Sequence, residues 1–160
     1  MKVADFGFAI KAADASKYSK YNVGSPLYMA PESLKRNEYS FKTDIWALGV
    51  ILHELLTGQT PWKAKNEKEL VRKIESERAE DIISRLNVPA QAKEFMQRAL
   101  RVDKAERMDV EDVASFDLTS APIPRNILGE KKVNVGRALS IFSPQVEKQS
   151  SNTRDLKELS

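Results

Sequence analysis

The chain has 160 residues, of which 41% are hydrophobic and 31% charged, and its formal net charge is +3 at pH 7. This length favours one domain with one core, and the absence of cysteine beside a single histidine excludes disulfide frameworks and Cys- or His-rich metal sites. Residues 125–160 hold seven Lys or Arg against four Asp or Glu, so the remainder is neutral and we expect no nucleic-acid partner.

The first residues lack the basic and apolar regions of a signal peptide, and no apolar stretch reaches the roughly 20 residues that span a bilayer. We therefore expect an intracellular protein, cytoplasmic by default, with no membrane partner.

The chain opens with a short strand-like segment that leads into Asp5-Phe6-Gly7. By itself this tripeptide indicates no more than a strand that ends in a glycine turn. Residues 8–23 are polar without a helical or strand period, which predicts a long loop, and loops of this length are usually functional or mobile.

Residues 24–32 read Gly-Ser-Pro-Leu-Tyr-Met-Ala-Pro-Glu. Pro26 and Pro31 fix φ and forbid a continuous helix, so we expect a rigid irregular segment followed by a short helix from Pro31.

Residues 42–58 are apolar over most of their length, with Thr43-Asp44 at the start and Gly58 at the end. This pattern predicts a helix that is apolar nearly all the way round and therefore belongs in the interior of a helical domain. His53 lies on it and is interpreted as a packed core histidine.

Three further helices are predicted downstream. One starts after Asn66, a second after Pro89, and a last short one after Asp109, each with apolar residues at helical spacing. Residues 75–81 are interpreted as a charged face or a linker. Beyond residue 118 the apolar pattern ends, and residues 119–160 are expected to form a disordered tail or a linker.

Four motifs in this order and spacing resemble the C-terminal lobe of eukaryotic protein kinases: Asp5-Phe6-Gly7, residues 24–32, Asp44-x-Trp46-x-x-Gly49, and Leu56-Thr57-Gly58-x-x-Pro61-Trp62. The resemblance extends through Arg107 and covers residues 1–118. It implies a mainly α fold, a partial kinase lobe built around a central buried helix. The Gly-Ser-Pro-x-Tyr form is similar to the serine/threonine branch.

In such kinases the residue that matches Asp5 is the catalytic-site carboxylate that binds Mg²⁺ at the ATP phosphates. The resemblance places Phe6 and Gly7 in the activation segment, with Ser16, Ser19 and Tyr21 as candidate phosphoacceptors. Tyr21 occupies a position where many relatives have threonine. The residues that would bind the protein substrate are Gly24, Ser25, Pro26 and Leu27.

The resemblance also implies scaffold roles. Glu32 and Arg107 match a buried ion pair, and Asp44 matches an aspartate that accepts hydrogen bonds from the catalytic loop. Trp46 and Gly49 belong to the same structural helix.

No Gly-rich phosphate loop, strand lysine or His-Arg-Asp catalytic loop occurs in the sequence. We therefore expect part of a serine/threonine kinase that transfers the ATP γ-phosphate to protein hydroxyls, with ATP and Mg²⁺ as cofactors of the complete enzyme. The 160 residues alone should bind these cofactors poorly, be inactive, and leave the central helix partly uncovered. The alternative is a non-catalytic binding module derived from a kinase, either a pseudokinase or a free-standing lobe.

Overall fold

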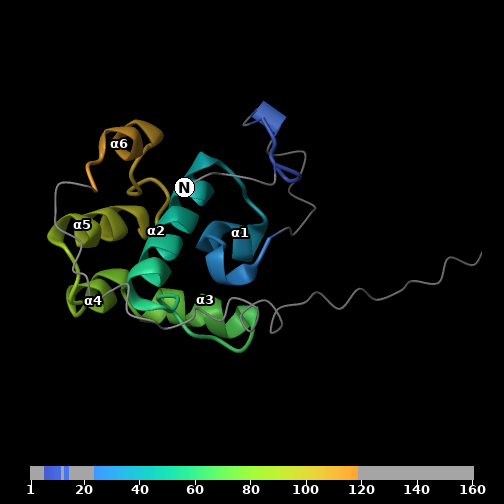
Figure 1. Ribbon diagram of the computed structural model, residues 1–160. Helices are drawn as coiled ribbons and strands as arrows, with labels where there is room; N and C mark the ends of the chain where they lie inside the picture. Colours follow the sequence, from blue (N-terminus) through green and yellow to red (C-terminus); the bar gives the residue numbers. More distant parts are fainter. Residues whose placement is uncertain (1–5, 12, 15–23, 119–160) are drawn as a thin grey trace, which may run out of the picture.

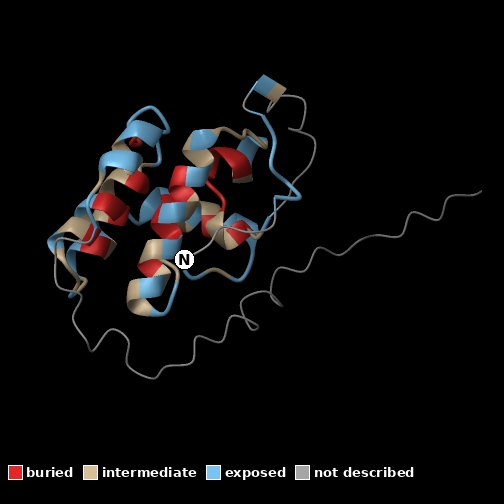
Figure 2. Ribbon diagram, turned by 45° about the horizontal axis from the view of Figure 1, so that its top comes forward, coloured by how far each residue is buried: buried red, intermediate tan, exposed pale blue. Residues whose placement is uncertain are grey.

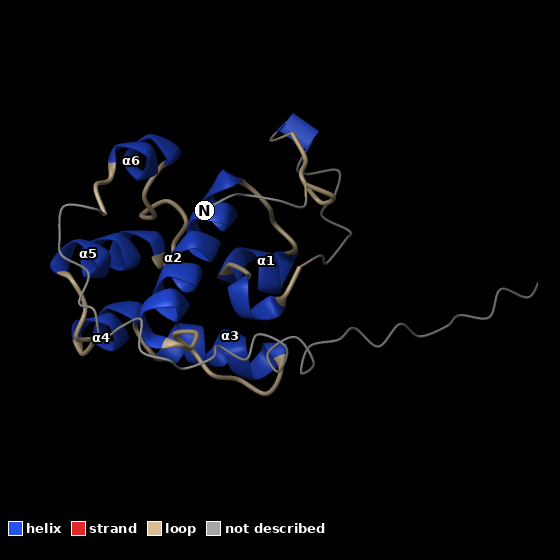
Figure 3. Ribbon diagram, viewed as in Figure 1, coloured by secondary structure: helices blue, strands red, loops and turns tan. Residues whose placement is uncertain are grey.

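The computed structural model describes residues 6–11, 13, 14 and 24–118 (Figure 1). Asp5, the candidate phosphoacceptors Ser16, Ser19 and Tyr21, and the expected tail 119–160 lie outside the described residues. Within the described ranges all regular structure is helical and there is no strand, which confirms the mainly α prediction (Figure 3). The elements are η2 (Pro26–Tyr28), α1 (Pro31–Arg36), α2 (Phe41–Thr57), α3 (Glu67–Ser76), α4 (Ala79–Ser84), α5 (Ala90–Ala99) and α6 (Val110–Ser115).

The long helix α2 begins at Phe41, one residue before its expected start, because Ser40 caps it. The Ser40 hydroxyl accepts from the Lys42 N–H at 3.2 Å, and the Thr43 hydroxyl donates to the Ser40 carbonyl at 2.6 Å. The helix ends, as predicted, at Gly58, whose φ of 77° lies in the left-handed region that favours glycine.

Helix α2 runs through the middle of the molecule, and the other helices surround it (Figure 1). It contacts α5, α6 and η2, while α4 packs on α5 and α3 packs on α1. At Gly49 the approach to the end of α5 is close, since a Cβ there would lie 2.9 Å from the Leu100 side chain. Glycine thus lets the side chains of Ala99 and Leu100 pack directly against the backbone of α2.

Two clusters of buried side chains form the core. The larger one contains Trp46 and Trp62, whose rings stack with centroids 5.5 Å apart and planes inclined by 5°. The smaller one joins Ile45 to Phe95 and Met108 on the side of α5 and α6. Both clusters therefore take their central residues from α2.

The downstream helices follow the sequence prediction at three places and depart from it at one. Asn66 caps α3, with its side chain accepting from the Glu69 N–H at 2.9 Å, and α5 and α6 follow Pro89 and Asp109 as expected. The run 75–81, interpreted as a charged face or a linker, holds the exposed end of α3 and the start of α4 at Ala79, so the linker alternative is wrong there and α4 was not predicted. Helix α4 has only two buried residues, Ala79 and Ile83, and two apolar positions in a charged run are not enough to predict a helix.

Only one face of α2 is covered. Its buried residues are Ile45, Trp46, Gly49, Val50 and His53. On the other face Leu48, Ile51 and Leu55 keep 43%, 40% and 59% of their surface exposed, and Figure 2 shows buried and exposed residues alternating along this helix. The expected burial of an apolar helix is thus fulfilled along one face, because no described segment lies over the other.

Among the described residues, no helix combines the length and apolar character that crossing a bilayer requires.

Candidate functional site

The segment from Gly24 to Leu27, predicted to bind a substrate, is a rigid turn. Gly24 has φ of 107°, a backbone conformation that side-chain-bearing residues rarely adopt. Ser25 is extended, and its carbonyl accepts from the Tyr28 N–H at 3.0 Å. Pro26 is buried at the first position of η2, so the turn is fixed by ring, glycine and hydrogen bond together.

Tyr28 fastens this turn to the C-terminal half of α2. Its hydroxyl donates to Glu54 Oε2 at 2.7 Å. Burial, with the Glu54 carboxylate as a second cause, raises the pKa of Tyr28 to about 12. The tyrosine therefore stays a hydrogen-bond donor at neutral pH. Sequence reasoning missed this contact because the two residues lie 26 positions apart and no local pattern links them.

Glu32 and Arg107 form a bidentate ion pair at the other end of the segment. Arg107 Nη1 lies 2.7 Å from Glu32 Oε1 and Nη2 lies 3.1 Å from Oε2, and the side chains are 0% and 4% exposed. The remaining guanidinium N–H groups donate to the backbone carbonyls of Arg101 and Lys42. Each of the five donors thus has an acceptor, which a buried guanidinium needs.

Trp46 connects this ion pair to the core. The Arg107 guanidinium carbon lies 5.1 Å from the Trp46 ring centroid, and the same indole stacks on Trp62. The indole N–H of Trp62 donates to the Glu77 carbonyl at 3.1 Å. Trp46 therefore links the Glu32–Arg107 ion pair to Trp62, whereas Gly49, one turn along, packs against Ala99 and Leu100.

Asp44 lies apart from these contacts. Within the described part of the chain its carboxylate has no hydrogen-bond or ion-pair partner, and partial burial raises the pKa of Asp44 above its ordinary range. It shares the uncovered face of α2 with Leu48 and Leu55, because these positions follow at intervals of four and seven residues.

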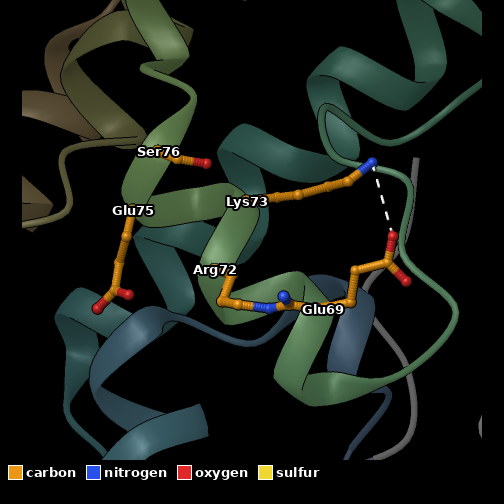
Figure 4. Close-up of a pocket in the computed structure, with 5 residues that line it drawn as sticks. All are labelled: Glu69, Arg72, Lys73, Glu75 and Ser76. Carbon is orange, nitrogen blue, oxygen red and sulfur yellow. Dashed lines mark ion pairs between the residues drawn. The ribbon is translucent and has the colours of Figure 1, made fainter.

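A depression of about 590 Å³ lies along α3. Its lining residues all belong to this helix, and the ion pair between Lys73 and Glu69 spans 3.9 Å (Figure 4). The lining residues are Glu69, Arg72, Lys73, Glu75 and Ser76. None comes from the 24–32 segment, so this depression is not the substrate site predicted from the sequence.

A family model described as protein kinase domain matches residues 1–118. The chain belongs to the serine/threonine protein kinase family. It is 41% identical over 127 residues to serine/threonine-protein kinase apg-1 of Neurospora crassa, covering 78% of this chain and 13% of that protein. It is 38% identical over 130 residues to serine/threonine-protein kinase atg1 of Aspergillus oryzae, covering 78% and 13%.

A third relative, serine/threonine-protein kinase ATG1 of Pyricularia oryzae, is 32% identical over 158 residues, which cover 97% of this chain and 15% of that protein. The kinase chain thus spans between 13% and 18% of the length of the curated relatives it matches. These names agree with the serine/threonine type that the Gly-Ser-Pro-x-Tyr sequence indicated.

In this kinase chain the structure brings some predicted site residues together and leaves others apart. It joins Glu32 to Arg107 and sets Trp46 beside them. Phe6, of which 69% is exposed, has no place in either core cluster. Within the described ranges no group of three His, Cys, Asp or Glu side chains could hold a metal ion.

Proposed function

We propose that this chain is the activation-segment and substrate-binding part of a serine/threonine kinase that transfers the ATP γ-phosphate to protein hydroxyls. The match of residues 1–118 to a protein kinase domain carries the proposal. Residues 119–160 would be a tail or linker after that domain, and Ser16, Ser19 and Tyr21 would be phosphoacceptors in the activation segment. Protein substrates would be the partners, without nucleic acid or membrane, in the cytoplasm.

The rigidity of the 24–32 segment supports a role in holding a substrate. Tyr28 ties its middle to Glu54 and Glu32 ties its C-terminal end to Arg107, so the segment is fixed to two different parts of the scaffold. A peptide laid against Gly24 to Leu27 would meet a surface that is already ordered. Such a surface positions the acceptor hydroxyl with little further loss of conformational entropy.

The uncovered face of α2 supports a partner segment of the same kinase. On this face Leu48, Ile51 and Leu55 form an exposed apolar stripe, and Asp44 lies at its N-terminal end without a partner among the described residues. Backbone N–H groups of a catalytic loop would satisfy the carboxylate, and an adjoining apolar segment would cover the stripe. We propose that the Gly-rich loop, strand lysine and catalytic loop are supplied alongside this chain.

Asp5 would bind Mg²⁺, which neutralises phosphate charge during phosphoryl transfer. Asp5 is one carboxylate, and Mg²⁺ needs several oxygen ligands, so the remaining ligands would come from the phosphates and from other parts of the complete kinase. We therefore propose that these 160 residues bind Mg-ATP poorly on their own.

Two measurements test the proposal. Purified residues 1–160 should show no melting shift with millimolar Mg-ATP, whereas a clear shift would contradict the view that this chain lacks most of the nucleotide site. The endogenous protein, isolated with an antibody against residues 63–78, should contain a His-Arg-Asp loop by peptide mass spectrometry and phosphorylate a generic protein substrate. An endogenous 18.1 kDa product with neither would overturn the enzyme assignment and favour a non-catalytic binding module.

A further inference from the structure

Lys42 lies in the first turn of α2, where a cation is unfavourable. The N-terminal end of a helix carries a partial positive charge, and acidic residues are preferred there. The Lys42 side chain is nevertheless only 14% exposed. Something other than helix stability therefore accounts for a buried ammonium at this position.

The ammonium group binds the loop that carries Arg107. Lys42 Nζ donates to the Arg107 carbonyl, lies 3.2 Å from the Met108 carbonyl and forms an ion pair of 2.6 Å with Asp109 Oδ1. Its three N–H donors thus match three acceptors on consecutive residues. This arrangement fixes the backbone of residues 107–109 against the start of α2.

The contact between Lys42 and Arg107 is reciprocal. Arg107 Nη1 donates to the Lys42 carbonyl at 2.8 Å, and the Lys42 ammonium donates to the Arg107 carbonyl. Glu32 and Asp109 supply the two carboxylates that balance these two cations. The four side chains, named here the Lys42 network, join α1, α2 and α6 through residues more than 60 positions apart in sequence.

We infer that Lys42 is a positioning residue for the substrate-binding segment and acts through Arg107. Lys42 holds the loop at 107–109, and this loop carries the Arg107 guanidinium. The guanidinium in turn holds Glu32, the last residue of the 24–32 segment. The structural part of this inference stands on the contacts above, and its catalytic consequence rests on the proposed kinase function.

Hydrogen exchange on the 160-residue protein tests the structural part. Lys42→Met keeps an apolar stem and removes the ammonium, so amide exchange should rise about tenfold or more in residues 31–36 and 105–112, where charged hydrogen bonds are lost. Exchange in α3 should stay unchanged. Lys93→Met is the matched control, because Lys93 Nζ also donates to a backbone carbonyl, that of Ser84, at 2.9 Å but joins α5 to α4.

Asp109→Asn tests the contribution of the ion pair by itself, since it removes the carboxylate charge but leaves both backbone acceptors of Lys42 in place. It should loosen the same residues less than Lys42→Met. Equal exchange in Lys42→Met and the parent protein, or a uniform rise across all helices that Lys93→Met reproduces, would overturn the inference.

The catalytic consequence is measured in the endogenous kinase that contains this chain. Lys42→Met should raise the KM for a protein substrate about tenfold, while the KM for ATP changes little. Local loosening without any change in the substrate KM would overturn the positioning role. If the unmodified kinase itself transfers no phosphate, the proposed function fails, and hydrogen exchange alone decides whether the Lys42 network holds the segment.

Discussion

The two faces of α2 are equally apolar in sequence and differ in what lies against them. On the buried face Trp46 stacks on Trp62 and Gly49 meets Leu100, while on the exposed face Leu48 and Leu55 have no described neighbour that covers them. The difference shows that hydrophobicity marks a surface for burial without specifying the partner. Among the described residues, η2, α5, α6 and the Trp62 region supply partners for the buried face.

The two faces also differ in whether the charged side chain beside each has hydrogen-bond partners. Arg107, next to Trp46, has an acceptor for each guanidinium N–H, whereas Asp44 on the exposed face has no partner in the described residues. A satisfied buried cation indicates a finished interface. Asp44 is exposed and can be hydrated, so the apolar stripe of Leu48, Ile51 and Leu55 is the feature that points to a further covering segment.

Removing the central indole should give the largest effect. Trp46→Ala removes a side chain that is 1% exposed, together with its stacking on Trp62, and should lower the free energy of unfolding by about 3–5 kcal/mol. Urea denaturation followed by circular dichroism measures this. Leu48→Ala on the other face is the control and should cost about 0.5 kcal/mol. Similar losses for both variants would contradict the distinction between the two faces.

Adding one methyl group at the closest helix contact should have a medium effect. Gly49→Ala brings a Cβ to 2.9 Å from Leu100 and 3.0 Å from Ala99, so overpacking should outweigh the gain in helix propensity and cost about 1–2 kcal/mol. Chemical denaturation again provides the measurement. The combined variant Gly49→Ala/Leu100→Ala should lose less than the sum of its parts, and strict additivity would refute a clash at this site.

His53 makes the stability of the buried face depend on pH. Its Nδ1 lies 2.8 Å from the Gln59 carbonyl, and its buried Nε2 has no hydrogen-bond partner among the described residues. Burial lowers the pKa of the imidazole despite opposing effects of Gln59 and Glu54. The unfolded chain therefore takes up a proton first, so unfolding free energy should be constant above about pH 6.5 and fall below it.

Each unit by which the pKa is lowered corresponds to about 1.4 kcal/mol of this pH-dependent loss. Unfolding by urea between pH 7.5 and 5 measures it, with His53→Gln as the variant that cannot gain the charge. The variant should show a flatter profile over this range. Identical slopes in both proteins would show that His53 does not titrate across the transition.

Charging the exposed face should have the smallest effect on folding. Leu48→Lys/Leu55→Lys should change the free energy of unfolding by no more than about 1 kcal/mol, since both positions lie at the surface. The same variant should bind less of a hydrophobic dye and associate less in sedimentation experiments. Val50→Lys, two residues from Leu48 but on the buried face, should fail to fold. A similar failure of the double variant would show that both faces are covered.

Local sequence signals predicted most of the helices because their determinants lie within a few residues. The glycine at Gly58 marked where α2 ends, the side chain of Asn66 marked the start of α3, and Asp109 marked that of α6. Where such a signal was absent, at α4, the prediction failed. The ordered motifs along residues 1–118 likewise identified the kinase family without a structure.

The tertiary structure decided how distant residues meet and which apolar surface is covered. Tyr28 and Glu54 are 26 positions apart and Lys42 and Met108 are 66 apart, so neither contact leaves a periodic trace in the sequence. Every residue between 45 and 52 reads as apolar or small, yet burial depends on where α5 and Trp62 fall in space. The sequence alone determines the helices and motifs, because capping and periodicity act over a few residues. Packing geometry determines which face of α2 is buried, how Tyr28 meets Glu54, and how the Lys42 network forms.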